Sequence, residues 1–345
     1  MSTDDIIQEA AGTEIPDDLT RMADQQARSQ DELLGLENVV GVGVGRKIEG
    51  GEATDTNALV VLVTHKMPPE SLGNQAVKRS INRVPTDVIE VGDIFAGGQM
   101  MAPEKTDPCS TEESVDIETL RNRVRPVRPG YSVGHPRVTA GTIGAGAYDL
   151  NNTVPGKPAR YYILSNNHVI ANSNDASPGD PIIQPGRVDG GQVPRDVIGR
   201  LDRFVPIRFI EPGQEPPCNY VDAAVAQVPF HLIDRDIYWN GHPASLFKTA
   251  EPDMLVKKTG RTTDFTTGRV QTINTTVNVN YGGGRVARFC RQIVTTDMSA
   301  GGDSGSLVLD LENNPVGLLF AGSSTVTILN PIAWVQGLLR IRLWP

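Results

Sequence analysis

The chain has 345 residues and a formal net charge of −9, and this length allows two or three domains with separate cores. A hydrophobic fraction of 39% with 35 glycines and 25 prolines favours a loop-rich β protein over a helical bundle. No basic cluster is interleaved with aromatic residues, so neither nucleic acid nor an anionic membrane is expected as a partner. No run approaches the roughly 18 apolar residues that a membrane-spanning helix needs.

The N-terminus and the cysteines bear on the compartment of the protein. Residues 1–5 are acidic and lack the basic and apolar regions of a secretory signal. Cys109, Cys218 and Cys290 lie far apart, and three cysteines cannot all pair within one chain. We therefore expect reduced thiols and a cytoplasmic location. No Cys-x-x-Cys or other metal-ligand spacing is present, so neither a metal nor a cofactor is expected.

The first third of the chain predicts a helix followed by a small α+β domain. Residues 1–16 are polar and expected to fray, and a partly amphipathic helix is expected from Pro16 to about Leu36. A small α+β domain is expected over 37–98, with strands over 39–45, 58–63 and 86–91. The glycines of the first strand lack the spacing of a nucleotide-binding loop and are interpreted as allowing close packing.

Residues 99–130 combine prolines with acidic and then basic residues. This composition predicts a linker with one short helix near 115–124. Its arginines are compatible with a cleavage site, a contact on the acidic body of the protein, or a solvated stretch; they are Arg121, Arg123, Arg125 and Arg128.

From Ser132 onward, short apolar segments alternate with glycine, proline and asparagine turns. A long surface loop follows residue 168, and a helix is expected to begin near Pro331. Strands are expected over 139–148, 160–165, 197–205, 219–226, 254–258, 267–273, 287–295, 306–311, 315–320 and 325–329.

Three stretches of this part of the chain combine residues with catalytic potential. Ser304 lies in the glycine-rich run 300–306, whose glycines allow a sharp turn that directs the N–H groups of Gly302 and Ser304 at one point. His168 follows an aliphatic strand, and Asp222 lies in a strand of small apolar residues. A serine hydroxyl needs a base to take its proton and donors to hold the oxyanion, and these residues can fill both roles.

The chain order His168, Asp222, Ser304, with Gly-Asp-Ser-Gly-Ser around the serine, resembles the trypsin/chymotrypsin-like serine peptidases of bacterial type. The resemblance implies that Ser304 is the nucleophile, His168 the general base, and Asp222 the group that orients the imidazole. It assigns the oxyanion-hole amides to Gly302 and Ser304. Ser165 matches a family position whose hydroxyl supports the aspartate.

The same resemblance implies the fold. It covers roughly residues 131–345 and implies a mostly β, chymotrypsin-like double barrel, with six antiparallel strands in each barrel. The first barrel is expected over 131–235, and the second, with the C-terminal helix, over 236–345. The catalytic cleft is expected between them, and the small α+β domain precedes both.

Asp303, next to the proposed nucleophile, needs a partner. In the animal zymogens of this family the matching aspartate pairs with a freed N-terminal amine, but no such sequence precedes the barrels here. The stretch 258–263 resembles a loop of the α-lytic-type members, in which a basic side chain is the partner. We expect Lys258, or failing that Arg261, to pair with Asp303.

The resemblance also suggests where substrate side chains bind. A primary pocket is expected at Met298, six residues before the nucleophile, and at Phe320, Ala321 and Gly322. No acid replaces Met298, so an apolar or small P1 residue is expected. Other histidines and two aspartates lack a matching context and are interpreted as structural: His65, His135, His231, His242, Asp234 and Asp236.

The sequence therefore predicts a serine endopeptidase that acts on a protein or peptide substrate without metal or cofactor. Residues 37–98 resemble, in position and class, the pro-regions of bacterial members, which assist folding and inhibit, and this would make the chain self-processing within 99–130. The alternative is a permanent docking or oligomerisation domain. For the site itself the alternatives are a catalytically silent, protease-like binding module and an esterase. The oligomeric state is not predicted.

Overall fold

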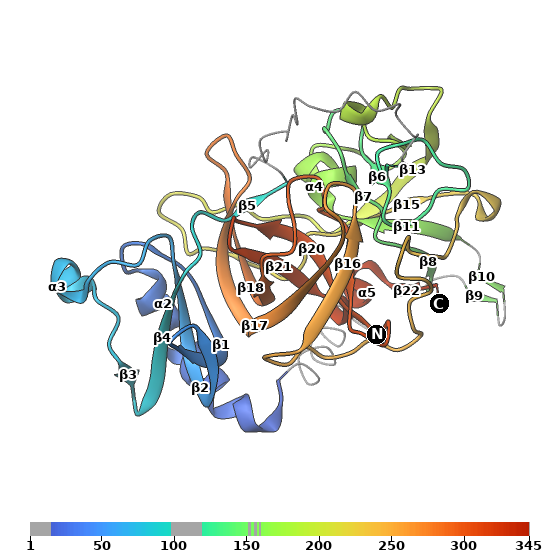
Figure 1. Ribbon diagram of the computed structural model, residues 1–345. Coiled ribbons are helices and arrows are strands. Elements are labelled where there is room, and N and C mark those ends of the chain that lie inside the picture. Colours follow the sequence, from blue (N-terminus) through green and yellow to red (C-terminus); the bar gives the residue numbers. More distant parts are fainter. Residues whose placement is uncertain (1–14, 98–118, 151–152, 155–156, 159, 345) are drawn as a thin grey trace, which may run out of the picture.

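The computed structural model describes residues 15–97, 119–150, 153–154, 157–158 and 160–344 (Figure 1). Strands dominate these residues and form a 12-stranded sheet, a six-stranded sheet and two-stranded sheets. The mostly β fold with two β units expected from the sequence is confirmed. The two-stranded sheets pair β6 (Ser132–Val133) with β7 (Gly141–Thr142) and β9 (Thr153–Val154) with β10 (Lys157–Pro158).

The first β unit is the six-stranded sheet, in which neighbouring strands are antiparallel. Alternate side chains enter different apolar clusters: Tyr162 and Leu164 join one, and Ile163 joins another. One edge strand comes from the C-terminus, so the unit extends beyond the expected 131–235. In spatial order the strands are β12 (Pro181–Ile183), β13 (Val197–Phe204), β15 (Ala224–Gln227), β11 (Tyr161–Ser165), β8 (Ala145–Asp149) and β22 (Ile341–Leu343).

The second β unit contains six strands that pair in a cycle, because β18 pairs with both β21 and β17. Strand β17 is long enough to pair with β16 through its first part and with β18 through the rest. These strands are orange to red in Figure 1. In cyclic order they are β16 (Leu255–Gly260), β17 (Asp264–Asn280), β18 (Val286–Thr296), β21 (Val326–Pro331), β20 (Pro315–Gly322) and β19 (Leu307–Leu309).

The N-terminal strands continue the sheet of the second unit, whereas a separate small domain was expected over 37–98. Strand β1 pairs antiparallel with β17, and β2, β4 and β3 follow it. A Cβ on Gly45 would collide with the carbonyl oxygen of Gln271, so glycine is what permits this approach. Their bounds are β1 (Val39–Glu49), β2 (Glu52–Val63), β3 (Ser80–Ile81) and β4 (Val84–Glu90).

Helix α2 covers the junction of β1 and β17. The Gln26 side-chain amide donates hydrogen bonds to the carbonyls of Val42, at 2.8 Å, and of Asn274, at 2.6 Å. This amide therefore joins the helix to both strands. The helices are α2 (Thr20–Leu34), α3 (Pro69–Leu72), α4 (Asn167–Ile170) and α5 (Ile332–Leu339), with 3₁₀ turns η1 (Asp17–Leu19), η2 (Gly73–Gln75), η3 (Asn172–Asn174), η4 (Arg187–Asp189) and η5 (Phe230–Leu232).

The described end of the expected linker, residues 119–130, packs on the first β unit. Arg123 Nε lies 3.1 Å from Asp196 Oδ1, and the guanidinium of Arg125 donates to the Gln184 carbonyl at 3.1 Å. Residues 119–124 form a turn, so the predicted helix is absent from this part, and the rest of it lies outside the described residues. Of the three interpretations of the arginines, contact with the body of the protein is the one that these residues show.

The prediction of reduced thiols is wrong for two of the three cysteines. Cys218 and Cys290 form a disulfide with a Cα–Cα distance of 5.7 Å. Strand β14 (Cys218–Asn219) pairs in parallel with β18, and this brings together two residues that are 72 positions apart in sequence. Spacing along the chain could not reveal this register, so the thiol argument for a cytoplasmic location fails. Cys109 lies outside the described residues.

One apolar cluster connects the two β units. It contains Leu164 and Val225 from the first unit and Leu307, Leu318 and Trp334 from the second, each at most 1% exposed. Because interiors are densely packed, this shared core fixes the strand ends of one unit against those of the other.

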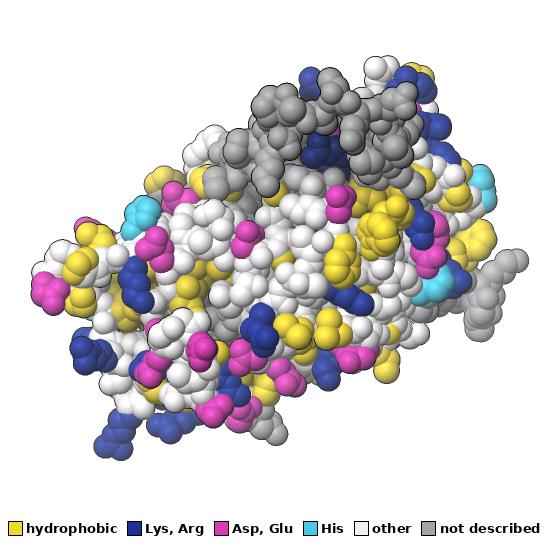
Figure 2. Space-filling view, viewed as in Figure 1, with side chains coloured by type: hydrophobic (Ala, Val, Ile, Leu, Met, Phe, Trp, Pro, Cys, Tyr) yellow, Lys and Arg dark blue, Asp and Glu magenta, His cyan; other side chains and the backbone are white. Residues whose placement is uncertain are grey.

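The surface and the helices give two further facts. On the face shown in Figure 2, Lys and Arg side chains are interspersed with Asp and Glu over the N-terminal strands. Within the described residues, the helices are all too short or too polar to cross a membrane.

Candidate active site

Two neighbouring strands bring the candidate base and acid together. Strands β11 and β15 are antiparallel, with Ser165 opposite Ala224. The residues that follow β11 and those that precede β15 therefore lie at the same end of this strand pair. There His168 Nδ1 lies 2.6 Å from Asp222 Oδ2, and the His168 backbone N–H donates to Asp222 Oδ1 at 3.1 Å. The sheet register therefore creates the pair that the sequence predicted.

Asp222 is fully buried and held from several directions. Its N–H donates to Asn330 Oδ1 at 2.9 Å, and its carbonyl accepts from the Asn166 side-chain amide at 2.6 Å. The Tyr281 hydroxyl donates to Asp222 Oδ2 at 2.7 Å. Burial, together with the negative charge of Asp222, raises the pKa of Tyr281 well above its ordinary value of 10.0, so this hydroxyl keeps its proton.

Tyr281 was missed by the sequence analysis. It lies at the tip of the β17–β18 hairpin, before the three glycines 282–284. The glycines signal a turn, but nothing local shows that this turn reaches Asp222. Ser165, which was expected to support the aspartate, instead donates to the Thr142 carbonyl at 2.8 Å.

The candidate nucleophile lies on a tight turn. The Asp303 N–H donates to the Ala300 carbonyl at 3.0 Å, and Gly302 and Gly305 both have φ +99°. An L-residue rarely adopts that backbone conformation, so the glycines are required. Among the described residues, the N–H groups of Gly302 and Ser304 make no hydrogen bond.

The serine and the histidine are not hydrogen-bonded to each other. The Ser304 hydroxyl donates to the Phe320 carbonyl at 3.4 Å. His168 Nε2 has no hydrogen-bond partner among the described residues, although the ring is only 8% exposed. The structure thus forms the candidate acid–base pair and the turn of the candidate nucleophile, but no hydrogen bond between Ser304 and His168.

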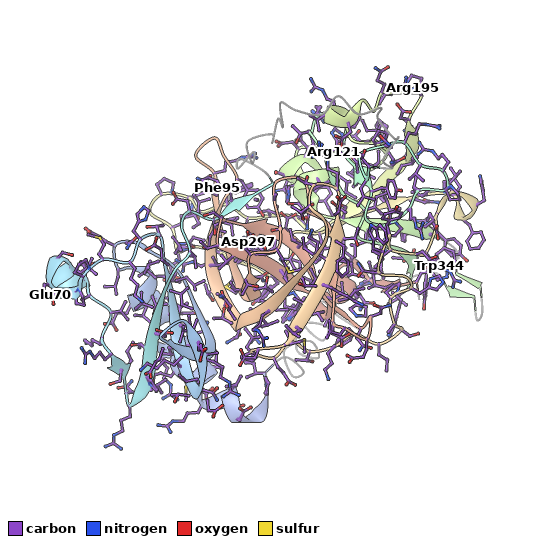
Figure 3. All side chains as sticks on the ribbon, in the orientation of Figure 1. Glu70, Phe95, Arg121, Arg195, Asp297 and Trp344 are labelled. Atoms are coloured by element: carbon purple, nitrogen blue, oxygen red, sulfur yellow. A yellow bond between two sulfur atoms is a disulfide. The ribbon has the colours of Figure 1, made fainter. Side chains whose placement is uncertain are left out.

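Strand β5 (Phe95–Ala96) lies in the space next to this histidine. It pairs antiparallel with β20, with Ala96 opposite Ala321 and Phe95 opposite Gly322. In Figure 1 it points towards α4, and Figure 3 labels Phe95 beside the β17–β18 hairpin. A Cβ built on Gly97 would lie 2.9 Å from His168 Nε2, so this backbone covers the imidazole edge.

Asp303 is paired with Lys258. Lys258 Nζ lies 3.3 Å from Asp303 Oδ2, and both side chains are fully buried. Asp303 also accepts from Thr263 Oγ1 at 2.6 Å and from the N–H groups of Thr262 at 2.8 Å and Ala300 at 3.0 Å. Burial lowers the pKa of Lys258, against the opposing attraction of Asp303.

Arg261, the alternative partner, makes a different ion pair. Its Nε lies 2.8 Å from Asp189 Oδ2, and Asp189 also accepts from Ser132 Oγ at 2.6 Å. Asp189 lies in η4 of the first β unit, so this ion pair connects the two units next to the nucleophile turn.

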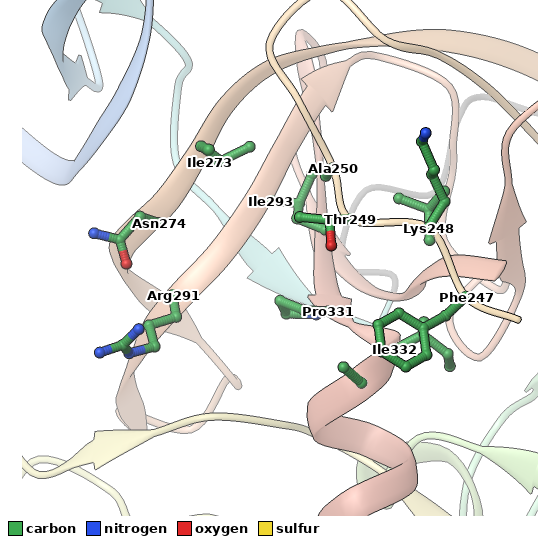
Figure 4. Close-up of a pocket in the computed structure, with 12 residues that line it drawn as sticks. Phe247, Lys248, Thr249, Ala250, Ile273, Asn274, Arg291, Ile293, Pro331 and Ile332 are labelled. Carbon is green, nitrogen blue, oxygen red and sulfur yellow. The ribbon is translucent and has the colours of Figure 1, made fainter. Parts of the chain in front are cut away.

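The residues expected to form a specificity pocket are covered. Met298 is 3% exposed and lies in the apolar core of the second unit, and Phe320 is fully buried. Ala321 and Gly322 pair with β5. The pocket in Figure 4 is elsewhere, between β17, β18 and the start of α5, and these four residues do not line it.

Four of the residues interpreted as structural make ion-pair contacts: His135, His242, Asp234 and Asp236. His135 Nε2 lies 3.3 Å from Asp180 Oδ2, and His242 Nδ1 lies 2.9 Å from Asp236 Oδ1. Asp234 lies 3.5 Å from Arg128. Their interpretation as structural agrees with these contacts.

Comparison with known proteins gives similar structures only. Neither a protein-family model nor a curated protein matches the sequence. Protease A of Thermobifida fusca is similar at 16% identity with a TM-score of 0.44, over 63% of this chain and 97% of that chain. Cellulomonas bogoriensis chymotrypsin gives 18%, 0.41, 63% and 98%, and Nocardiopsis protease gives 16%, 0.42, 64% and 99%. We base the functional inference on the geometry of the site.

Proposed function

We propose that the chain is a serine endopeptidase that cleaves peptide bonds through Ser304, His168 and Asp222. The observation that carries the proposal is the dry His168–Asp222 pair, whose imidazole leaves Nε2 unpaired among the described residues. A buried carboxylate bonded to Nδ1 fixes the tautomer in which Nε2 can accept a proton. The serine turn, with two free amides, comes from the unit packed against this pair.

The proposed reaction has two balanced halves. Ser304 Oγ attacks the carbonyl carbon while His168 Nε2 takes its proton, and the Gly302 and Ser304 amides hold the oxyanion. The C–N bond then breaks, and the imidazolium gives the proton to the leaving amine. A water molecule attacks the acyl-enzyme in the same way, which releases the carboxylic acid and restores the serine.

The proposal includes inhibition by the N-terminal part of the chain. Strand β5 adds to the edge of β20, which is how an extended peptide binds a sheet edge. With Gly97 against Nε2, a substrate cannot lie between His168 and Ser304. The serine hydroxyl correspondingly faces the Phe320 carbonyl. Activity would begin when a conformational change moves this strand away, and self-processing would follow.

A second candidate is a catalytically silent binding module. It is favoured by the absent Ser304–His168 hydrogen bond, since a permanently separated pair has no general-base catalysis. The two candidates differ in one respect, which is whether Ser304 reacts once β5 has been displaced.

Covalent labelling of Ser304 by a fluorophosphonate probe distinguishes these candidates. The key variant is Gly97→Ala, because its new Cβ would lie 2.7 Å from His168 Cδ2 and should displace β5. Gly92→Ala is a matched control: Gly92 also has positive φ, +69° against +55° at Gly97, but its Cβ would meet only Ser323 at 4.0 Å. Ala96→Pro, which cannot donate to the sheet, is a second way to release the strand.

We expect Gly97→Ala and Ala96→Pro to label at least about tenfold faster than wild type and Gly92→Ala. A tenfold change in rate corresponds to a barrier difference of about 1.4 kcal/mol. Ser304→Ala should not label, and His168→Ala in the released chain should be slower by roughly 10³-fold or more. Peptide hydrolysis should follow the same order. No labelling in any released variant would establish the silent module. Equal labelling of wild type and Gly97→Ala would instead refute only the part of the proposal in which β5 inhibits the site.

A further inference from the structure

We propose that Tyr281 is a positioning residue of the catalytic site, and that the hydrogen bond from its hydroxyl to Asp222 sets how strongly the carboxylate binds the imidazole. This inference rests on the proposed function and deepens it. The contact comes from the β17–β18 hairpin of the second unit, whereas Asp222 and His168 belong to the first. One hydroxyl thus connects the acid to the unit that carries the nucleophile.

The hydroxyl shares a single oxygen with the histidine. Asp222 Oδ2 accepts from Tyr281 at 2.7 Å and from His168 Nδ1 at 2.6 Å, while Oδ1 accepts from the His168 backbone N–H. Two donors on one oxygen divide its charge between them. Removing the tyrosine donor concentrates that charge on the imidazole N–H, so the His168–Asp222 bond becomes stronger and the protonated imidazole is favoured.

The ring of Tyr281 is fixed independently of this bond. Its centroid lies 5.5 Å from that of Phe209 and 6.2 Å from that of Phe289, and its plane is nearly perpendicular to the His168 ring at 6.1 Å. The Arg285 guanidinium lies over Phe209. Because this aromatic cluster holds the ring, Tyr281→Phe should keep the packing and lose only the hydroxyl.

The titratable and charged groups around the hydroxyl are Asp222, which accepts its hydrogen bond, the His168 ring, and Arg285, which directly precedes β18. The Arg285 guanidinium acts on the Tyr281 hydroxyl through its charge, and it also lies 3.8 Å from Asp175; the Arg285 carbonyl accepts from the Tyr281 backbone N–H at 2.8 Å. Asp222 is therefore the group through which the hydroxyl affects the pH dependence of the site.

A matched control exists in the first unit. The Tyr162 hydroxyl donates to Asp149 Oδ2 at 3.2 Å, and the Tyr162 side chain is fully buried. Tyr162→Phe therefore removes a tyrosine–aspartate bond, together with the bond that this hydroxyl accepts from Arg203 at 3.1 Å, without touching Asp222 or His168. Both variants should fold and melt similarly, whereas Tyr281→Ala, which also removes the ring, should melt at a lower temperature.

The decisive measurement is the ¹H–¹⁵N resonance of the His168 Nδ1 proton in the full chain labelled with ¹⁵N-histidine, since it requires no turnover. We expect Tyr281→Phe to move this proton downfield and Tyr162→Phe to leave it in place. In the Gly97→Ala background, Tyr281→Phe should move the acidic limb of the kcat/KM profile upward, so that kcat/KM falls about tenfold at a pH on that limb, whereas Tyr162→Phe should leave the limb in place.

The outcomes separate this inference from the proposed function. An Nδ1 resonance that is the same in wild type and Tyr281→Phe would overturn the positioning role, even if the chain is an active peptidase. A shifted resonance without peptide hydrolysis in any released variant would leave the positioning of Asp222 established and the peptidase proposal refuted.

Discussion

Replacing Lys258 with methionine tests how the acid next to the nucleophile is stabilised. Lys258 and Asp303 are both fully buried, with Nζ 3.3 Å from Oδ2. Methionine keeps much of the length of the lysine chain but removes the ammonium. The carboxylate then retains its donors from Thr262, Thr263 and Ala300, but it loses the cation that the described residues pair with it.

The magnitude follows from burial. Two unit charges 3.3 Å apart attract by about 5 kcal/mol at an effective dielectric constant of about 20. Burial lowers the pKa of Lys258 in spite of Asp303, so the cost of removing the ammonium from water is larger than its attraction to the carboxylate. Loss of one partner of a buried pair destabilises by about 3–5 kcal/mol, and we expect the lower end, about 3 kcal/mol.

Urea unfolding at pH 7, followed by tryptophan fluorescence, measures this loss. All variants should carry Ser304→Ala so that self-processing cannot affect the result. Lys47→Met is the control, because the Lys47–Glu49 pair is 34% and 62% exposed and its loss should leave the urea midpoint nearly unchanged. Adding Asp303→Asn to Lys258→Met should recover part of the loss, since no unpaired charge then stays buried.

The result that would refute this reasoning is a Lys258→Met chain within 1 kcal/mol of its parent, a limit of about a third of the loss expected for a buried pair. A double variant less stable than Lys258→Met would equally contradict it, because it would show that the carboxylate is not the source of the loss.

Three further predictions concern stability in the same background. Burial lowers the pKa of His135 below its ordinary 6.5, so the unfolded chain binds more protons and stability should fall as pH drops through 6.5. His135→Gln should make the urea midpoint depend less on pH in this range. An unchanged pH dependence in this variant would contradict the prediction. Cys218→Ser with Cys290→Ser should cost about 4 kcal/mol because the disulfide closes a loop of 72 residues, and a dithiothreitol-insensitive wild type would argue against the bond. Gly45→Ala should lower the unfolding free energy by about 1–3 kcal/mol, since its Cβ would meet the Gln271 carbonyl; an unchanged urea midpoint would exclude tight contact between β1 and β17.

The residues that the sequence predicted well have local signatures. The glycines around Ser304 specify a turn whatever the rest of the chain does, and their positive φ values are what that turn requires. His168 and Asp222 each lie next to a short apolar strand, and pairing those strands is enough to bring them together. The contact of Lys258 with Asp303 was expected from the resemblance of the stretch 258–263 to a loop of a known family, and the structure has this contact.

The features that the sequence did not predict depend on register between distant strands. Cys218 meets Cys290 because β14 adds to β18, and Tyr281 reaches Asp222 because the β17–β18 hairpin is long. The apolar periodicity of a strand indicates which of its side chains face the core, but it does not indicate which other strand pairs with it. Ser165 shows the converse, since a position that matched by pattern has Thr142 as its partner.

The fusion of the N-terminal strands with the second β unit is the most consequential of these features. Because β1 pairs with β17, the segment after β4 starts from a fixed point of the same sheet and reaches β20 within a few residues. Asn280, next to Tyr281, donates to the Ile94 carbonyl at 2.9 Å, so the hairpin that holds Asp222 also holds the strand that covers His168. A separate domain on a flexible linker would compete with substrate at an effective concentration that depends on the length of the linker. On the proposed function, a strand held by the same sheet would compete with substrate from a fixed position, and breaking its own contacts at Ala96 or Gly97 would therefore be the direct way to uncover the site.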